Sequence, residues 1–262
     1  MIGAVIGDIV GSVFEFDNRR SVDFPLFSSK STFTDDSVLT FATADVLLGQ
    51  GDYAAAYQNF ARRYPHRGYG GNFWHWIYAD DPKPYNSFGN GSAMRVSPVG
   101  FAFESLEETL EEARRSAEVT HNHPEGIKGA QATAHVIYLS RKGASKAEIK
   151  QEIIQSYGYD LSRPLDLIRE VNQFNETCPG SLPEAISVFL EGKDYENTIR
   201  LAVSIGGDTD TIACIAGGMA QAFYGGIPAW VVREARARLG LEFLDILDKF
   251  QAQFPAASPL LT

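Results

Sequence analysis

Helical signals recur along the whole chain, and they limit the possible folds more strongly than any other feature. Three capping-box patterns occur, Ser105-x-x-Glu108, Ser145-x-x-Glu148 and Ser181-x-x-Glu184, in which Ser and Glu satisfy free N–H groups at a helix start. Apolar residues elsewhere recur with a period near 3.6, whereas two-residue alternation never persists beyond a few positions. The sequence predicts an all-α fold with helices near 37–48, 53–64, 105–118, 124–142, 145–157, 181–191, 195–204, 211–224, 228–239 and 242–254.

Length and composition favour one domain over residues 1–262. The chain has 262 residues with 44% hydrophobic content, enough to bury a sizeable core, and no polar stretch has the repetition of a flexible linker. A net charge of −10 with scattered arginines argues against a nucleic-acid backbone as a partner. We expect nucleic acid to matter only as a modified substrate.

The compartment is predicted from the first residues and the cysteines. Residues 1–14 are apolar but include Asp8 and have no basic flank, which fits neither a signal peptide nor a membrane span. Cys178 and Cys214 lie far apart, as expected of buried thiols in a reducing compartment. We therefore expect a cytoplasmic monomer with no membrane partner.

The sequence also predicts a helix at the start of the chain, and this helix has two distinct faces. Gly3, Gly7 and Gly11 recur every four residues and form a smooth face that lets another helix approach closely. Asp8 and Glu15 share a different face, because seven residues make close to two turns. Asp8 either points into the core, where it would need a partner, or lies on the surface.

Two acidic clusters, Thr34-Asp35-Asp36-Ser37 and Asp208-Thr209-Asp210-Thr211, each precede an apolar, helix-like run. Neighbouring residues on a regular helix diverge by about 100°, so neither pair of carboxylates can converge on an ion from mid-helix. Both clusters must therefore lie at turns or caps. Each alone is also typical of a simple helix cap, whereas two such clusters together favour a metal site.

The ligand types select the metal. Carboxylate and hydroxyl oxygens suit Mg²⁺, Mn²⁺ or Ca²⁺, whereas zinc usually takes Cys or His, which neither cluster contains. The second cluster also lacks the glycine and closing Glu of a calcium-binding helix-loop-helix. The sequence predicts Mg²⁺ or Mn²⁺ ahead of Ca²⁺.

Two glycine-rich turns, 67–71 and 87–95, are candidates for phosphate binding. Glycine lets backbone N–H groups approach a phosphate, although a tight turn between helices is the more common reason for a single glycine-rich segment. Phe88 could stack on a nucleobase or pack in the core. His121 and His123 precede a predicted helix, where they could bind a metal or an anion, or one could cap the helix.

The ordered set of segments resembles the ADP-ribosylglycohydrolase family, which includes the dinitrogenase reductase-activating glycohydrolases. The resemblance spans residues 3 to 225, and the segments that carry it are Gly7-Asp8-x-x-Gly11-x-x-x-Glu15, Thr34-Asp35-Asp36-Ser37, Arg67-Gly68-Tyr69-Gly70, Gly89-Asn90-Gly91-Ser92-Ala93-Met94-Arg95, Thr120-His121 and Gly206-Gly207-Asp208-Thr209-Asp210-Thr211. Ser37 stands where the family often has Thr, and Ser92 where it often has Gly or Ala. The resemblance implies a compact orthogonal helix bundle with two Mg²⁺ or Mn²⁺ ions in a central cleft.

The resemblance also implies a role for each matching residue. The metal ligands would be Thr34, Asp35, Asp36, Asp208, Asp210 and Thr211. The substrate contacts would be Gly70, Gly71, Ser87, Phe88, Gly89, Asn90, Gly91 and His121, with Phe88 on adenine and His121 beside the diphosphate. Glu15 would be a mobile acidic residue, and either Glu15 or Asp36 would be the catalytic base.

The implied activity is hydrolysis of the bond between ADP-ribose and its acceptor, most often arginine on a protein, with serine, nucleobase and O-acetyl esters as alternatives. Two other functions stay open at this stage. One is a catalytically idle ADP-ribose-binding or toxin-blocking immunity protein. The other is a divalent-metal phosphatase with Asp208 as nucleophile, which would need a β-strand at 201–205 and a parallel sheet.

Overall fold

The structure, a computed structural model, describes residues 1–49 and 51–255; the end of the expected domain, 256–262, lies outside them. Helices account for the regular structure of this part, and two residues, Gly89 and Thr177, form an isolated β-bridge. The predicted all-α fold is therefore confirmed. The helices are α1 (Ile2–Gly11), α2 (Asp35–Leu47), α3 (Tyr53–Arg63), α4 (Gly71–Ile77), α5 (Gly91–Met94), α6 (Ser97–Ala102), α7 (Leu106–Glu118), α8 (Pro124–Arg141), α9 (Lys146–Tyr157), α10 (Leu165–Val171), α11 (Cys178–Glu191), α12 (Tyr195–Ser204), α13 (Thr209–Tyr224), α14 (Ala229–Arg236) and α15 (Leu241–Gln253).

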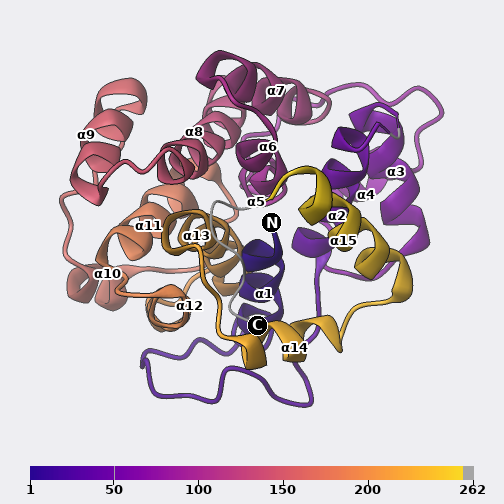
Figure 1. Ribbon diagram of the computed structural model, residues 1–262. Helices are drawn as coiled ribbons and strands as arrows, with labels where there is room; N and C mark the ends of the chain where they lie inside the picture. Colours follow the sequence, from indigo (N-terminus) through magenta and orange to yellow (C-terminus); the bar gives the residue numbers. More distant parts are fainter. Residues whose placement is uncertain (50, 256–262) are drawn as a thin grey trace.

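Helices α1 and α13 form the centre of the molecule (Figure 1). Helices α11 and α12 pack against α13 on one side, and α2, which contacts α3 and α15, lies on the other. Helix α8 also contacts α13 and carries α7 and α9 on its outer surface. Every residue of α1 is buried, as expected of a helix whose residues other than Asp8 are apolar or glycine.

The glycine face of α1 packs directly on α13, so the predicted close approach is confirmed. A Cβ atom added to Gly7 would lie 2.0 Å from the carbonyl oxygen of Ala213. One added to Gly11 would lie 2.5 Å from the Cα of Asp210. No side chain fits at these contacts, and the same approach brings the acidic start of α13 beside Asp8 of α1.

Gly7→Ala should therefore destabilise the protein strongly. The added methyl group meets helix backbone that cannot move aside, and overpacking of this kind costs about 1–3 kcal/mol or more. Urea unfolding measures the loss. Gly240→Ala is the matched control, because a Cβ there meets nothing within 4 Å, and it should stay within about 1 kcal/mol of wild type. Equal stability of the two variants would contradict the close contact.

Two predicted helix boundaries differ from the observed ones by three residues. Helix α11 begins at Cys178, three residues before the predicted Ser181, and Thr177 caps it by accepting a hydrogen bond from the Gly180 N–H. Pro179 fits the first turn of this helix because that position needs no N–H donor. Helix α14 ends at Arg236 rather than at 239, and the short helices α4, α5, α6 and α10 were not predicted.

The apolar run before Asp208 is helical. Residues 201–204 complete α12, so the strand that the phosphatase alternative needs is not formed there. No described helix combines the length and the apolar character required to cross a membrane.

Candidate functional site

Both acidic clusters begin a helix, as their spacing predicts. Thr34 is the N-cap of α2, and its hydroxyl accepts a hydrogen bond from the N–H of Asp36. Asp208 is the N-cap of α13 but makes no capping hydrogen bond with its side chain. Helix capping therefore explains the presence of Thr34, but it does not explain the carboxylates of either cluster.

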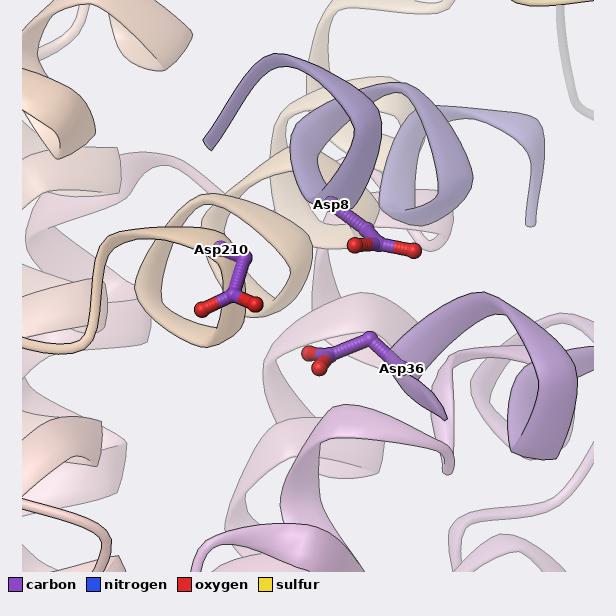
Figure 2. Close-up of side chains that lie close together, drawn as sticks. All are labelled: Asp8, Asp36 and Asp210. Atoms are coloured by element: carbon purple, nitrogen blue, oxygen red, sulfur yellow. The ribbon is translucent and has the colours of Figure 1, made fainter. Parts of the chain in front are cut away.

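Carboxylates from three helices converge at one point. Figure 2 shows Asp8 of α1, Asp36 of α2 and Asp210 of α13 with their side chains directed toward one another. One oxygen from each lies within 4.8 Å of the other two, and Glu15, Asp208 and Asp210 form a second group of the same size. Asp210 belongs to both groups, so the site offers two adjacent places for a cation.

The residues fit a hard divalent ion. All ligand atoms that the two groups offer are carboxylate oxygens, which Mg²⁺ and Mn²⁺ prefer. Asp36 Oδ1 is buried and has no hydrogen-bond partner within the described part of the chain. An unpaired buried carboxylate oxygen is costly unless a cation compensates it, so this atom points to an ion-binding role.

Burial and mutual repulsion disfavour the charged forms of these groups. Burial, and then the charges of Asp210 and Asp8, raise the pKa of Asp36 well above its usual value. The same effects, burial first and then Asp210, raise the pKa of Glu15 to about 8. Burial raises the pKa of Asp208 to about 6. The cluster therefore needs either protons or cations near neutral pH.

Asp8 lies in the core, which decides between the two alternatives for this residue. Its carboxylate accepts hydrogen bonds from the N–H of Thr34 at 3.0 Å and the N–H of Ser37 at 3.1 Å. The Thr34 hydroxyl donates to it at 2.7 Å, and the Ser37 hydroxyl donates to it as well. Asp8 thus holds the start of α2 against α1, and Ser37 supplies the hydroxyl that this position needs.

The six predicted metal ligands do not all occupy equivalent positions. Asp36, Asp208 and Asp210 belong to the carboxylate groups, which also include Asp8 and Glu15. Asp35 lines the cleft outside both groups, and its N–H donates to the Arg67 carbonyl at 2.8 Å. The Thr34 hydroxyl turns to Asp8. Thr211 lines the cleft, with its hydroxyl 3.4 Å from Asp36 Oδ2.

A cavity of about 390 Å³ opens beside the carboxylates, large enough for a small-molecule ligand. Tyr85, Arg95, Phe174 and Glu176 contribute to its wall, and the sequence interpretation assigned none of them a role. The eight residues predicted to contact substrate all line it: Gly70, Gly71, Ser87, Phe88, Gly89, Asn90, Gly91 and His121. Residues far apart in the chain thus surround one cleft.

Asn90 connects the glycine-rich turn to the carboxylates. Its side-chain amide donates to Asp208 Oδ2 at 2.7 Å and to Ser181 Oγ at 2.9 Å, and its backbone N–H donates to the Glu176 carbonyl at 2.7 Å. The resemblance assigned Asn90 to the pyrophosphate and ribose. The structure shows that its amide also holds a predicted metal ligand in place.

The two histidines have different positions. His123 is the N-cap of α8, and its Nδ1 accepts from the Glu125 N–H at 3.1 Å. His121 is buried and lines the cleft. Phe88 is 45% exposed at the cleft wall, and its ring centroid lies 5.2 Å from that of His123. An exposed aromatic face is thus available at the position predicted to receive adenine.

Asn18 links Glu15 to the Asp208 turn, a role with no signal in the sequence. Its amide donates to the Glu15 carbonyl at 3.1 Å and to the Gly207 carbonyl at 3.1 Å, and it accepts from the Gly207 N–H at 2.8 Å. Gly206 and Gly207 have φ values of +68° and +82°, a conformation that glycine adopts without strain. Asn18 and these glycines together fix the turn that precedes Asp208.

Known proteins are similar to this chain in sequence and in fold. Residues 1–256 match the family model described as ADP-ribosylglycohydrolase. The ADP-ribosylhydrolase ARH3 of Mus musculus is 27% identical, with 86% of this chain and 82% of that protein covered. The ADP-ribosylarginine hydrolase Tri1 of Pseudomonas putida (strain GB-1) is 26% identical over 90% of this chain and 73% of its own length.

A solved structure titled ADP-ribosylglycohydrolase-related protein complex superposes on this fold with a TM-score of 0.73. It is 26% identical, and the match covers 98% of this chain and 95% of that one. The family model and this structural match agree over nearly the whole chain. The protein belongs to the ADP-ribosylglycohydrolase family.

Proposed function

We propose that the protein hydrolyses the glycosidic bond between ADP-ribose and its acceptor, with ADP-ribosyl-arginine on proteins as the preferred substrate. The observation that carries this proposal is the convergence of five carboxylates beside a cleft of ligand size. Relatives named ADP-ribosylhydrolase and ADP-ribosylarginine hydrolase support the substrate class. The reaction would reverse protein ADP-ribosylation.

The carboxylate groups would hold two Mg²⁺ or Mn²⁺ ions, with Asp210 contributing to both places. Bound divalent ions would neutralise the cluster, orient the hydroxyls of the distal ribose and lower the pKa of water. Asp8 would hold the start of α2 against α1 beside these ions through its bonds to Thr34 and Ser37. Asn90 would orient Asp208 from the substrate side.

Glu15 and Asp36 remain the two candidates for the base that removes a proton from the attacking water. Both lie in the carboxylate groups and line the cleft. Glycosidic cleavage passes through an oxocarbenium-like transition state, which nearby carboxylates stabilise by their charge. Asn18 joins the backbone of Glu15 to the turn that precedes Asp208.

The substrate assay is direct. Arginine-, serine- and nucleic-acid-linked ADP-ribose are incubated with the protein and Mg²⁺, and released products are identified by mass spectrometry. We expect free ADP-ribose from the arginine-linked substrate at the highest rate. Tight ADP-ribose binding with no release from any substrate would instead support the catalytically idle binding protein, the alternative that intact carboxylates disfavour.

Phe88→Ala should weaken ADP-ribose binding by about 5- to 150-fold, since stacking on a base contributes roughly 1–3 kcal/mol. Ribose 5-phosphate, which lacks the base, should bind weakly to both proteins. Metal affinity should not change, because no ligand is removed. Calorimetric titration measures each value, and Tyr78→Ala serves as the control because Tyr78 is 51% exposed and outside the cleft wall. Equal ADP-ribose affinities for Phe88→Ala and wild type would place adenine elsewhere.

A further inference from the structure

Arg95 carries a buried positive charge in the wall of the cleft. Its Nη2 donates to the Ser116 carbonyl at 2.8 Å and to Thr120 Oγ1 at 2.9 Å. The guanidinium lies over the ring of Tyr57, 4.1 Å from its centroid. Nε and Nη1 are buried without a hydrogen-bond partner among the described residues. A fully buried arginine with so few acceptors needs a purpose beyond packing.

Thr120 connects Arg95 to His121. Its Oγ1 lies 2.7 Å from His121 Nδ1. A guanidinium can only donate, so Thr120 Oγ1 accepts from Arg95 and keeps its own hydrogen for another acceptor. Accepting from a cation also polarises the hydroxyl and makes it a stronger donor. The favoured arrangement is a chain in which Arg95 donates to Thr120, and Thr120 donates to Nδ1.

His121 must then carry its hydrogen on Nε2. Burial, and after it the charge of Arg95, lower the pKa of His121 well below its usual value, so the ring is neutral and has one N–H. Nε2 faces the glycine-rich turn: a Cβ on Gly91 would lie 3.2 Å from it and one on Gly89 3.5 Å. Glycine at these positions keeps the space before this nitrogen free of side chains.

We propose that Arg95 and Thr120 are positioning residues that hold His121 as the Nε2–H tautomer, so that its ring donates to a phosphate oxygen of the substrate at the Gly89–Gly91 turn. The opposite tautomer would direct a lone pair at an anion and repel it. The phosphate contact rests on the proposed function, whereas the tautomer does not. The two parts are therefore tested separately.

The tautomer is read from the ¹⁵N spectrum of histidine-labelled protein at neutral pH. His121→Gln identifies the signals of His121 among the five histidines by their loss. We expect an unprotonated Nδ1 and a protonated Nε2 in wild type, a shift toward the other tautomer in Thr120→Val, and the wild-type pattern in Thr120→Ser. Thr133→Val is the matched control, because the hydroxyl of this buried threonine donates to the Gly129 carbonyl within its own helix, α8. A protonated Nδ1 in wild type, or an unchanged tautomer in Thr120→Val, would overturn the proposed hydrogen-bond chain from Arg95 through Thr120 to His121.

The phosphate contact is read from calorimetry with ADP-ribose and with adenosine, which has no phosphate. Thr120→Val should weaken ADP-ribose by up to about 10-fold, because a hydrogen bond to a charged group is lost in part of the population. Thr120→Ser should restore the affinity, and adenosine should bind all three proteins alike. A redistributed tautomer with unchanged ADP-ribose affinity would refute the contact. Failure of wild type to bind ADP-ribose would refute both the phosphate contact and the proposed function. The ¹⁵N spectrum would still test the hydrogen-bond chain that sets the tautomer of His121.

Discussion

Asp210→Asn should lower turnover by more than about 100-fold. A loss of up to about 100-fold is typical when the mutated residue only supports a metal ligand by a hydrogen bond. Asp210 is the carboxylate that both groups share, so its loss weakens two places for a cation at once. Asparagine keeps the shape and can still accept the Thr211 N–H, which Asp210 Oδ1 accepts at 2.9 Å. Single-turnover rates with saturating Mg²⁺ measure the effect.

The same variant should be more stable than wild type when no metal is bound. Without metal, Asp210→Asn removes a carboxyl group whose charged form is disfavoured by burial and by Asp208, so its melting temperature in chelator should exceed that of wild type. Its stabilisation by Mg²⁺ should be largely lost. Asp245→Asn, on the exposed pair with Lys249, should behave like wild type in both assays. Wild-type turnover in Asp210→Asn would exclude Asp210 as a ligand.

Chelation should abolish hydrolysis, and Mg²⁺ or Mn²⁺ should restore it without any need for Zn²⁺. Five carboxylates grouped in two sets cannot orient a substrate while they repel one another, and the donor set contains no thiolate or imidazole. Product release is measured before EDTA is added, in the presence of EDTA, and after Mg²⁺, Mn²⁺ or Zn²⁺ is added back. Undiminished turnover after exhaustive chelation would refute the metal mechanism.

The metal-free protein should also lose stability as pH rises from about 5 to about 8. Burial and Asp210 raise the pKa of Glu15 to about 8 in the folded state, above its usual value of 4.5, so the folded chain holds a proton that the unfolded chain releases in this range. A bound cation compensates the negative charge of the cluster in place of that proton. The gain in melting temperature from Mg²⁺ should therefore be larger at pH 8 than at pH 5, and an equal gain would show that the cluster is already charged when empty.

The sequence predicted the features that depend on local chemistry. Period and capping indicated the all-α fold, and the α7 and α9 caps at Ser105 and Ser145 are confirmed. The glycine spacing of α1 indicated a close helix contact, because only a backbone free of side chains can approach so nearly. The divergence of adjacent Asp residues on a helix placed both acidic clusters at helix starts, where they are found.

Features that depend on distant contacts could not be predicted. Asn18 bonds Gly207, 189 residues away, and no local pattern marks that pairing. The Ser181 box failed because the hydroxyl serves Asn90 and the Asn175 carbonyl, while Glu184 pairs with Arg163 at 2.6 Å. Arg95 is part of a glycine-rich segment in the sequence, yet its burial against Tyr57 and Thr120 appears only in the assembled fold.

The contact between α1 and α13 sets the order in which the protein can assemble. The N–H of Gly3 donates to Gln221 Oε1 at 2.7 Å across 218 residues of chain, and every residue of α1 is buried in the finished fold. During synthesis α1 therefore emerges long before the helix that covers it, and its apolar surface must wait in a loose or chaperoned state. Because Asp8 and Asp210 meet only when α13 docks on α1, the cation site can be completed only after α13 has been synthesised.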